Sequence, residues 1–482
     1  MKKRTRKAMA LSLALAMVFT MLTACSKNEE AAETSKATTA TKESEAQKEE
    51  ATSEPTKEAE KDAASEPTVE AGKEKRVITI GTWYDHYYTS DHDDVYDNPD
   101  VSDVETAQMQ LDNMRAIEEK YNVELRFVNL TWDGTMESIN TSIMAGTPDC
   151  DIYEVDLQFG IPAALSGYAQ PLEDFIPADD DIFNDQTVMK YLNVLGMDKD
   201  YLFAGNSIQL GAYPLAFNMD MINEAGLENP QDLYDRGEWT WDKFREYMIA
   251  LTKDNDGDGV VDVYGYGGWW TTMLNQLLMS NGANIAGSTK EGLSSPATIE
   301  VMDFIYNMYN TDKVAKPWNE DDWNINTSCY ADGQIAFWPS AAWVFSSYGG
   351  SDLEFEIGVV PWPVGPSGNQ ETNKHYLTAG NYYIIPTGVE DPYFVYKVFY
   401  DWTNWFDGDT SLRDDTEWFE NQMMTERNFD YLKVMGTKEQ FDIWGSLDVV
   451  SMVDIMNGTK TAAQYAEENK QLVQAKLDDY FK

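Results

Sequence analysis

Apolar residues along the chain form either short continuous runs or stretches in which they recur every three or four positions. Val77–Ile80 is a run typical of a buried strand, and the helical spacing that follows covers 104–121. A second strand is predicted at Val123–Phe127, a second helix over 136–143 and a third strand at Asp151–Val155. The pattern therefore indicates a β-α-β-α-β series.

Helices between successive strands imply right-handed crossovers, which leave the strands parallel to one another. We therefore predict an α/β fold built on a largely parallel, open sheet with helices on both faces. The length of the chain favours two lobes of this kind over a single core.

Aromatic and acidic residues follow each of the three predicted strands. They are Trp83, Tyr84 and Asp85 after the first strand, Trp132 and Asp133 after the second, and Asp156 with Gln158 and Phe159 after the third. The carboxyl ends of parallel strands are where open α/β sheets bind ligands. An aromatic ring can cover the C–H face of a sugar while a carboxylate accepts hydrogen bonds from its hydroxyl groups. The alternative is that these side chains are packed or lie in loops without a ligand.

The first residues of the chain predict a lipoprotein signal. Basic residues at 2–7 precede the apolar stretch Ala8–Met21, which is shorter than the roughly 20 residues of a membrane span. It ends at Leu22-Thr23-Ala24-Cys25, where small residues suit cleavage ahead of a lipid-modified thiol. We expect residues 1–24 to be removed and Cys25 to carry a diacylglyceryl group, usually with an added acyl chain, as a membrane anchor. An ordinary secretory signal with a chance cysteine is the alternative.

Residues 25–75 predict a disordered linker between this anchor and the folded part. The stretch is rich in Glu, Lys, Thr, Ser and Ala, and Val69 is its one larger aliphatic residue after Cys25. Such a composition buries too little apolar surface to offset the entropy of ordering. The protein is expected on the outer face of the cytoplasmic membrane, in a bacterium without an outer membrane.

The charge balance argues against nucleic acid as a partner. The chain has 83 acidic and 36 basic residues, a net charge of -47, whereas phosphate binding needs basic patches. Aromatic residues make up 13% of the chain, and many of them must fill the core, but the excess favours stacking on sugar rings. Cys150 and Cys329 are expected to be buried free thiols, although the compartment would permit a disulfide.

Several segments, in this order and spacing, resemble the carbohydrate-binding solute-binding proteins of ABC importers, the two-lobed family that includes bacterial maltose-binding protein. The segments are Ala145-Gly146-Thr147-Pro148-Asp149, Gly167-Tyr168-Ala169-Gln170-Pro171-Leu172, Tyr213-Pro214 leading to Phe217-Asn218-Met219-Asp220, Trp239-Thr240-Trp241-Asp242 and Ala331-Asp332-Gly333-Gln334-Ile335-Ala336-Phe337. The resemblance implies a first lobe of 76–210 plus 358–400 and a second of 211–357 plus 401–482, joined by a hinge. It also implies capture of a sugar, most simply an oligosaccharide, between the lobes and delivery to the permease subunits of an ABC transporter.

The strand-edge pattern and the resemblance together place ligand contacts on both lobes. In the first lobe they are the strand-edge residues Trp83, Tyr84, Asp85, Trp132 and Asp156 together with Asn381. In the second lobe they are Tyr213, Trp269, Trp270, Trp338 and Trp343, of which Trp343 occupies the family's stacking position. A monomer without catalytic residues and without a required cofactor is the implied form.

One acidic segment has the spacing of an EF-hand calcium loop. Asp254, Asp256, Asp258 and Asp262 stand at its first, third, fifth and ninth positions, and the carbonyl of Val260 would be the seventh-position ligand. The expected glutamate at the twelfth position is Gly265, so a structural calcium site would be truncated and weaker. An exposed acidic turn without metal is the alternative.

An extracellular glycoside hydrolase is the rival function, because it too would present tryptophans and paired carboxylates in an open cleft. We find no zinc-binding HExxH, no GxSxG nucleophile turn and no phosphate-binding GxxxxGKS loop in the sequence. A third reading is a metal held by His86 and His92 with their neighbouring aspartates.

Overall fold

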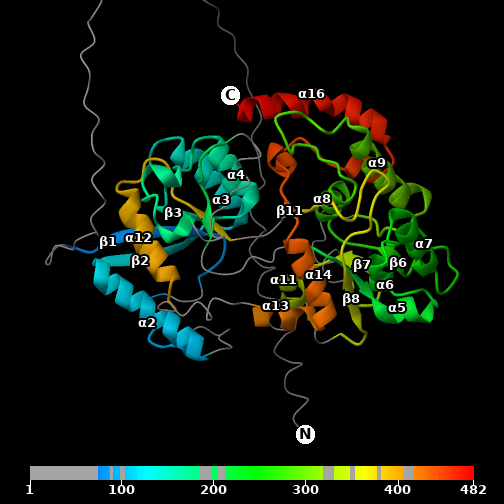
Figure 1. Cartoon of the computed structure of the whole chain (residues 1–482), viewed down its shortest axis with the longest axis horizontal. Coiled ribbons are helices and arrows are strands. Elements are labelled where there is room, and N and C mark those ends of the chain that lie inside the picture. Colours follow the sequence, from blue (N-terminus) through cyan, green and yellow to red (C-terminus); the bar gives the residue numbers. More distant parts are fainter. Residues whose placement is uncertain are drawn as a thin grey trace, which may run out of the picture. The chain divides into compact units, whose positions relative to one another are not determined.

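The computed structural model describes residues 74–86, 89, 91–97, 104–183, 197–204, 212–318, 330–347, 353–376, 381–405 and 416–481. They belong to one compact unit, Ala63–Lys482, and contain a five-stranded sheet, a four-stranded sheet and a two-stranded ribbon among helices (Figure 1). The predicted signal, Cys25, nearly all of the predicted linker and Cys329 lie outside the described residues.

The five-stranded sheet, here the first sheet, begins with the predicted series. Its strands are β1 (Arg76–Thr82), β2 (Val123–Asn129), β3 (Ile152–Val155), β4 (Phe203–Ala204) and β10 (Tyr382–Ile384), in the order β2-β1-β3-β10-β4. β1 is parallel to β2 and to β3, as predicted, with Ile80 opposite Phe127 and Ile152. β10 is antiparallel to both of its neighbours.

Helices on the first sheet follow from its apolar pattern. They are α2 (Val104–Tyr121), α3 (Trp132–Ser138) with its π-helical continuation Ile139–Ile143, α4 (Leu157–Leu165) and α12 (Pro392–Thr403). α2 buries Leu111, Met114 and Ile117 at helical spacing, and it packs against α12, which comes from far along the chain (Figure 1). The predicted helices over 104–121 and 136–143 are therefore confirmed.

The four-stranded sheet, here the second sheet, is mixed. Its strands are β5 (Leu215–Asn218), β6 (Tyr264–Tyr266), β7 (Ile335–Pro339) and β8 (Ile357–Val360), in the order β6-β7-β5-β8. β6 and β7 are parallel, whereas β5 is antiparallel to β7 and to β8. The predicted mostly parallel sheets are therefore confirmed, with one reversed strand in each: β10 in the first sheet and β5 in the second. The two reversals were not predicted, because apolar periodicity does not reveal where the chain leaves one sheet for the other.

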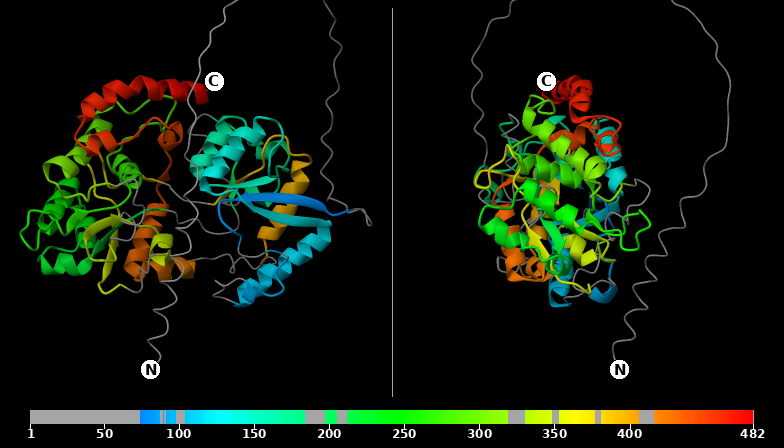
Figure 2. Two further views of the ribbon diagram at one scale, coloured as in Figure 1. Left: turned by 180° about the vertical axis from the view of Figure 1, so that it is seen from behind. Right: turned by 90° about the vertical axis from the view of Figure 1, so that its right-hand side faces the viewer.

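The remaining helices surround the second sheet. They are α5 (Met219–Glu224), α6 (Pro230–Asp235), α7 (Trp241–Leu251), α8 (Trp270–Ser280), α9 (Pro296–Tyr306), α11 (Ala342–Ser347), α13 (Thr416–Met423), α14 (Glu426–Gly436), α15 (Val453–Met456) and α16 (Ala462–Tyr480). The long helix α16 runs over α9 and α15 (Figure 2). The ribbon pairs β9 (His375–Tyr376) with β11 (Glu439–Gln440), and the 3-10 helix η9 (Ile443–Leu447) follows it.

The chain returns to the first sheet later than the sequence suggested. β8 pairs with β5 along its whole length, and Trp241 donates its backbone N–H to the Val364 carbonyl, so the chain is still in the second sheet's surroundings after 358. The strand that rejoins the first sheet is β10, at 382–384. The predicted return at 358 is therefore too early, because a strand that ends one sheet and a strand that begins another look alike in sequence. The predicted crossing at 210–211 lies outside the described residues.

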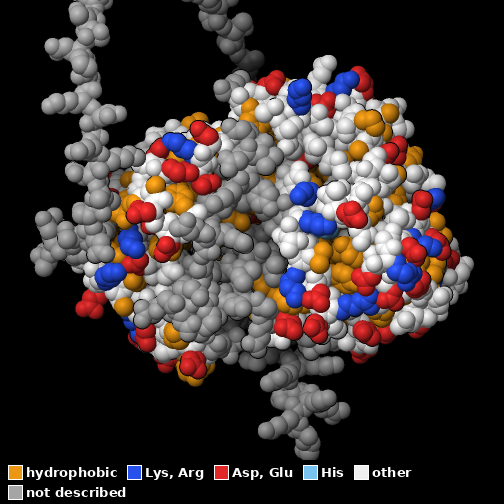
Figure 3. Space-filling model, in the orientation of Figure 1, with side chains coloured by type: hydrophobic (Ala, Val, Ile, Leu, Met, Phe, Trp, Pro, Cys, Tyr) orange, Lys and Arg blue, Asp and Glu red, His pale blue; other side chains and the backbone are white. Residues whose placement is uncertain are grey.

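Acidic and basic side chains are interspersed on the face shown in Figure 3. Many described Lys and Arg residues pair with the protein's own carboxylates, as Lys120 does with Asp401 and Arg427 with Asp232, both at 2.7 Å. Such surface pairs contribute about 1 kcal/mol or less each. On this face the described basic residues are thus spread among acidic ones and form no continuous basic patch that could bind a polyanion.

Candidate ligand-binding site

Three aromatic rings meet at the carboxyl-end edge of the first sheet. Trp83 follows β1, Trp132 opens the helix after β2, and Phe159 lies in the first turn of α4 after β3. The Trp83 and Trp132 rings meet edge to face with centroids 5.4 Å apart, and the Trp132 and Phe159 centroids are 4.5 Å apart. Trp132 is 42% exposed, which is high for such a large apolar side chain. Parallel strand order thus brings the predicted aromatic residues together, and it leaves one indole open to solvent.

Asp156 lies at the same edge as a buried acid. It is the N-cap of α4, where its carboxylate accepts hydrogen bonds from the backbone N–H and, at 3.2 Å, from the side-chain amide of Gln158. Its side chain is buried, and this burial raises the pKa of Asp156 to about 7. Asn381 is exposed and comes directly before Tyr382, which pairs with Val155, so the register places Asn381 beside Asp156. The predicted residues Asp156 and Asn381 are therefore neighbours on adjacent strands.

Tyr84 and Asp85 have partners within the first sheet's own residues. The Tyr84 hydroxyl donates to Glu154 Oε1 at 3.2 Å, and Asn129 Nδ2 donates to Asp85 Oδ1 at 3.0 Å. Glu154 lies in the middle of β3, and burial raises the pKa of its carboxyl to about 7. Asp85 is exposed at the edge, whereas Tyr84 is half-buried with its hydroxyl turned toward the sheet. Of the two predicted residues, Asp85 is the one placed to meet a ligand.

A second aromatic group surrounds the ends of the second sheet's strands. Trp269 follows β6, Trp343 lies in α11 after β7, and Tyr213 precedes β5. The Trp269 and Trp343 rings are stacked, with centroids 5.8 Å apart and planes 23° apart. Trp343 Nε1 donates a hydrogen bond to the Tyr213 hydroxyl at 2.9 Å. Trp343 is 37% exposed, so it offers part of its ring to solvent from a fixed setting.

Trp270 and Trp338, the other two predicted tryptophans, have different surroundings. Trp270 opens α8 half-buried, with its ring 5.9 Å from that of Trp444 in η9. Trp338 is fully packed inside β7, where it stacks on Tyr330 with centroids 4.7 Å apart. The prediction that Trp338 contacts the ligand is therefore wrong. All five residues of β7 are buried, so both faces of the sheet are covered at this strand.

Asp156 and the helix it caps also have links to the part of the chain around the second sheet. Burial raises the pKa of Tyr213 and of Tyr376, and the negative charge of Asp156 adds to the shift in each. Both tyrosines belong to the part of the chain around the second sheet. A further link joins α4 to η9, where Ser446 Oγ donates to the backbone carbonyl of Gln158 at 3.0 Å. The helix that Asp156 caps therefore lies against η9, a segment from the part of the chain around the second sheet.

Sequence reasoning left some of these neighbours out of the predicted set. The sequence pattern places Phe159 after the third strand beside Asp156, but the predicted ligand contacts did not include it. Tyr376 and Trp444 come from β9 and η9, which are far from the strand ends along the chain. Nothing in the local sequence marks either residue, because their placement depends on contacts between distant segments.

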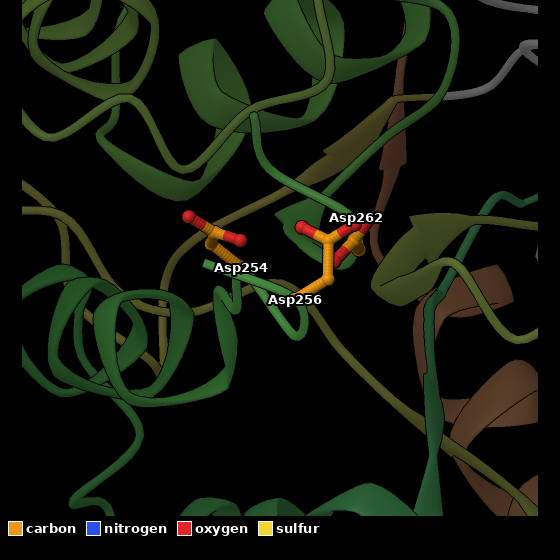
Figure 4. A group of neighbouring side chains, drawn as sticks. All are labelled: Asp254, Asp256 and Asp262. Carbon is orange, nitrogen blue, oxygen red and sulfur yellow. The ribbon is translucent and has the colours of Figure 1, made fainter. Parts of the chain in front are cut away.

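The acidic loop between α7 and β6 gathers three of its four predicted carboxylates (Figure 4). One ligand oxygen from each of Asp254, Asp256 and Asp262 lies within 4.8 Å of the others, and all three side chains are exposed. Asp254 accepts hydrogen bonds from the backbone N–H groups of Gly257 and Gly259, which lower its pKa. Asp258 is outside this group, and its carboxylate accepts instead from the backbone N–H of Val260.

His86 lies in an aromatic cluster rather than in a metal-binding group. Its ring stacks on Phe127 with centroids 3.7 Å apart and lies 5.5 Å from Trp402. Burial lowers the pKa of His86 to about 4, with a smaller contribution from His92. Among the described residues, Asp254, Asp256 and Asp262 form the one group of three acids, cysteines or histidines close enough to share an ion. The reading of His86 and His92 as metal ligands is not supported.

The sequence from 113 to 403 matches the family model of bacterial extracellular solute-binding proteins. The chain belongs to this family. No curated protein matches the chain at a significant level. Within the described residues, no helix is both long enough and apolar enough to cross a membrane.

Solved structures of substrate-binding proteins share the fold over most of the chain. ABC substrate-binding protein Lmo0181 from Listeria monocytogenes, in complex with cycloalternan, has a TM-score of 0.58 and 15% identity, covering 84% of this chain and 100% of that one. The GacH receptor of Streptomyces glaucescens, solved unliganded and with acarbose, has a TM-score of 0.57 and 14% identity, covering 85% and 100%. The MalE domain from Bdellovibrio bacteriovorus, bound to maltotriose, has a TM-score of 0.56 and 14% identity, covering 84% and 100%. The predicted two-lobed α/β fold of a solute-binding protein is thereby confirmed.

The buried Glu154 should make the stability of the protein depend on pH. Its pKa lies at about 7, above the ordinary 4.5, so the folded state binds a proton more tightly than the unfolded chain does. The free energy of unfolding should therefore fall as pH rises from about 4.5 to about 7, by about 3 kcal/mol at roughly 1.4 kcal/mol for each pKa unit. Glu154→Gln, which keeps an oxygen for the Tyr84 hydroxyl, should be more stable than the wild type by that order at about pH 8 and equal to it at about pH 4.

Urea unfolding at a series of pH values measures this difference. Glu119→Gln is a matched control, because it removes one charge from an exposed position of the neighbouring helix α2. The control should follow the wild type at every pH. A difference between Glu154→Gln and the wild type that stays constant across this range would contradict the role of Glu154.

Proposed function

We propose that this protein captures a neutral carbohydrate between its two lobes and delivers it to the permease of an ABC transporter. The observation that carries the proposal is the pair of aromatic groups at the strand ends of the two sheets, each with one indole more than a third exposed, together with the buried carboxylate of Asp156. Indole faces cover the C–H faces of sugar rings, and the carboxylate of Asp156 accepts hydrogen bonds from hydroxyl groups. The family consists of extracellular binding proteins, and the similar structures above hold cycloalternan, acarbose and maltotriose.

The energy required for this capture is modest. A dissociation constant near 1 μM corresponds to about -8 kcal/mol, which remains after the ordering of ligand and side chains has been offset. Stacking on Trp132 and Trp343, together with several hydrogen bonds to hydroxyl groups, can supply a binding free energy of this order. Ligands with more than one sugar ring suit two platforms better than a single ring does, so we propose an oligosaccharide.

We further propose that Cys25 carries the lipid anchor and that residues 26–75 tether the folded part to the membrane. The signal-like sequence before Cys25 and the polar composition after it support this arrangement. About 50 residues of flexible chain span on the order of 40 Å, which allows the binding domain to search for solute while attached. The protein is expected to act as a monomer and to release its ligand chemically unchanged.

Calcium binding at the loop between α7 and β6 is a separate proposal. Carboxylate oxygens are the ligands that Ca²⁺ prefers, and those of Asp254, Asp256 and Asp262 converge within one ion's reach. Gly265 stands where an EF-hand has its bidentate glutamate, so we expect a weak site with a dissociation constant of about 10⁻⁴–10⁻³ M. The ion would fix the loop that links α7 to β6. Through β6 it would also steady Trp269, which follows that strand.

Isothermal titration calorimetry with a panel of neutral oligosaccharides tests the main proposal. Wild-type protein should bind at least one member, and Trp343→Ala should weaken that binding about 30-fold, the equivalent of about 2 kcal/mol for truncating a packed aromatic contact. Tyr96→Ala, which removes an aromatic ring 67% exposed beside α2, is the control and should bind as the wild type does. A reducing-end assay on the same mixtures should detect no product.

Two results would contradict the proposal. Unchanged affinity in Trp343→Ala would remove the second aromatic group from the site. New reducing ends formed at a catalytic rate would favour the glycoside hydrolase instead.

Thermal unfolding with and without calcium tests the loop. Binding to the folded state alone raises stability by RT ln(1 + [L]/Kd), so about 10 mM CaCl₂ should raise the melting temperature of the wild type by a few degrees relative to EDTA. Asp254→Asn should abolish the rise, whereas Asp242→Asn, which removes an exposed charge from the first turn of α7, should keep it. Equal shifts in both variants would show that calcium acts elsewhere.

A further inference from the structure

The hydrogen bond between Trp343 and Tyr213 joins an exposed side chain to a buried one. Trp343 Nε1 donates to the Tyr213 hydroxyl at 2.9 Å, and Trp343 is 37% exposed whereas Tyr213 is 7% exposed. An exposed indole on a short helix such as α11 can take up more than one rotamer, and a hydrogen bond to its N–H selects one of them. The Tyr213 hydroxyl is therefore placed to decide where the indole face points.

Tyr213 is itself held firmly in position. Its carbonyl accepts a hydrogen bond from Trp362 Nε1 at 2.8 Å, and its ring lies edge to face with that of Trp269, centroids 6.4 Å apart. The next residue is Pro214, whose carbonyl accepts from the backbone N–H of Ser340. Backbone and ring are thus fixed by the second sheet, independently of any ligand.

We infer that Tyr213 is a positioning residue, whose hydroxyl fixes the Trp343 indole in its ligand-stacking orientation before the ligand arrives. This inference rests on the proposed function and assigns Tyr213 a role different from direct ligand contact. The Tyr213 side chain offers the ligand little surface. Trp269 covers the Trp343 indole from one side, at 23° between planes, and the hydrogen bond to Tyr213 prevents rotation within that stack.

The consequence for binding is pre-organisation. A side chain that must be immobilised when the ligand binds reduces affinity, and a side chain that is already held does not. Asp156 adds to the arrangement, because its charge acts on the Tyr213 hydroxyl from the edge of the first sheet.

Tyr213→Phe tests the inference, because it removes the hydroxyl and keeps the ring. We expect the ligand affinity measured by calorimetry to fall about 10-fold. The variant should still fold, so the change is in ligand binding and not in the folded fraction. Tyr247→Phe is the matched control, since it also removes one tyrosine hydroxyl. Tyr247 lies in α7, and its hydroxyl donates to the Glu228 carbonyl at 3.0 Å. The control should bind ligand as the wild type does.

A double-mutant cycle separates positioning from a general structural effect. Trp343→Phe keeps an aromatic face and removes the N–H that donates the hydrogen bond to the Tyr213 hydroxyl. If the hydrogen bond is the cause, the losses in Tyr213→Phe and Trp343→Phe overlap, and the double variant binds about as weakly as the weaker single variant. Losses that multiply in the double variant would overturn the inference, and so would wild-type affinity in Tyr213→Phe.

Fluorine NMR gives a readout that needs no ligand. In protein labelled with 5-fluorotryptophan, the resonance absent from Trp343→Phe belongs to Trp343. This resonance should be single in the wild type and should shift and broaden or split in Tyr213→Phe, as the indole samples further orientations. If no saccharide binds the wild type, the proposed function fails while this measurement still decides the inference; an unchanged Trp343 resonance in Tyr213→Phe would overturn it.

Discussion

Burial of the Asp156 carboxylate is the constraint on which the candidate site depends. A carboxylate removed from water needs hydrogen-bond donors, and Asp156 finds them in Gln158, at the positive end of α4. The position is fixed by β3, which runs parallel to β1 and β2, and these two strands end at the same edge with Trp83 and Trp132. The helix that Asp156 caps, α4, packs against η9, which belongs to the part of the chain around the second sheet. The charge of Asp156 also adds to the burial that raises the pKa of Tyr213 and Tyr376.

This arrangement suits a neutral ligand with many hydroxyl groups. Such a ligand brings donors to the acid without bringing a second negative charge, and its flat C–H faces match exposed indoles. The net charge of -47 agrees with the same view, because an acidic surface repels anions over a long range while leaving neutral solutes unaffected. Aromatic stacking then gives contact area, and hydroxyl hydrogen bonds give orientation.

The sequence predicts the local parts of this structure well. Apolar periodicity identified β1, α2, β2 and β3, and from their parallel order it followed that Trp83, Trp132 and Asp156 share an edge. The directions of β5 and β10 and the late return of the chain were missed, because they depend on which distant segments meet. The same reason explains the wrong placement of Trp338, which looks like its exposed neighbour Trp343 in sequence but lies within β7. Tyr376, unmarked in the sequence, comes under the charge of Asp156 only through the fold.

The central claim is that one ligand is held by residues of both sheets. Hydrogen–deuterium exchange with and without a saturating saccharide tests it most directly, since amides slowed by the ligand report where it is bound. We predict slower exchange both at 156–160, where α4 begins after β3, and at 341–345, where α11 begins after β7. Protection confined to one of these two segments would contradict the account.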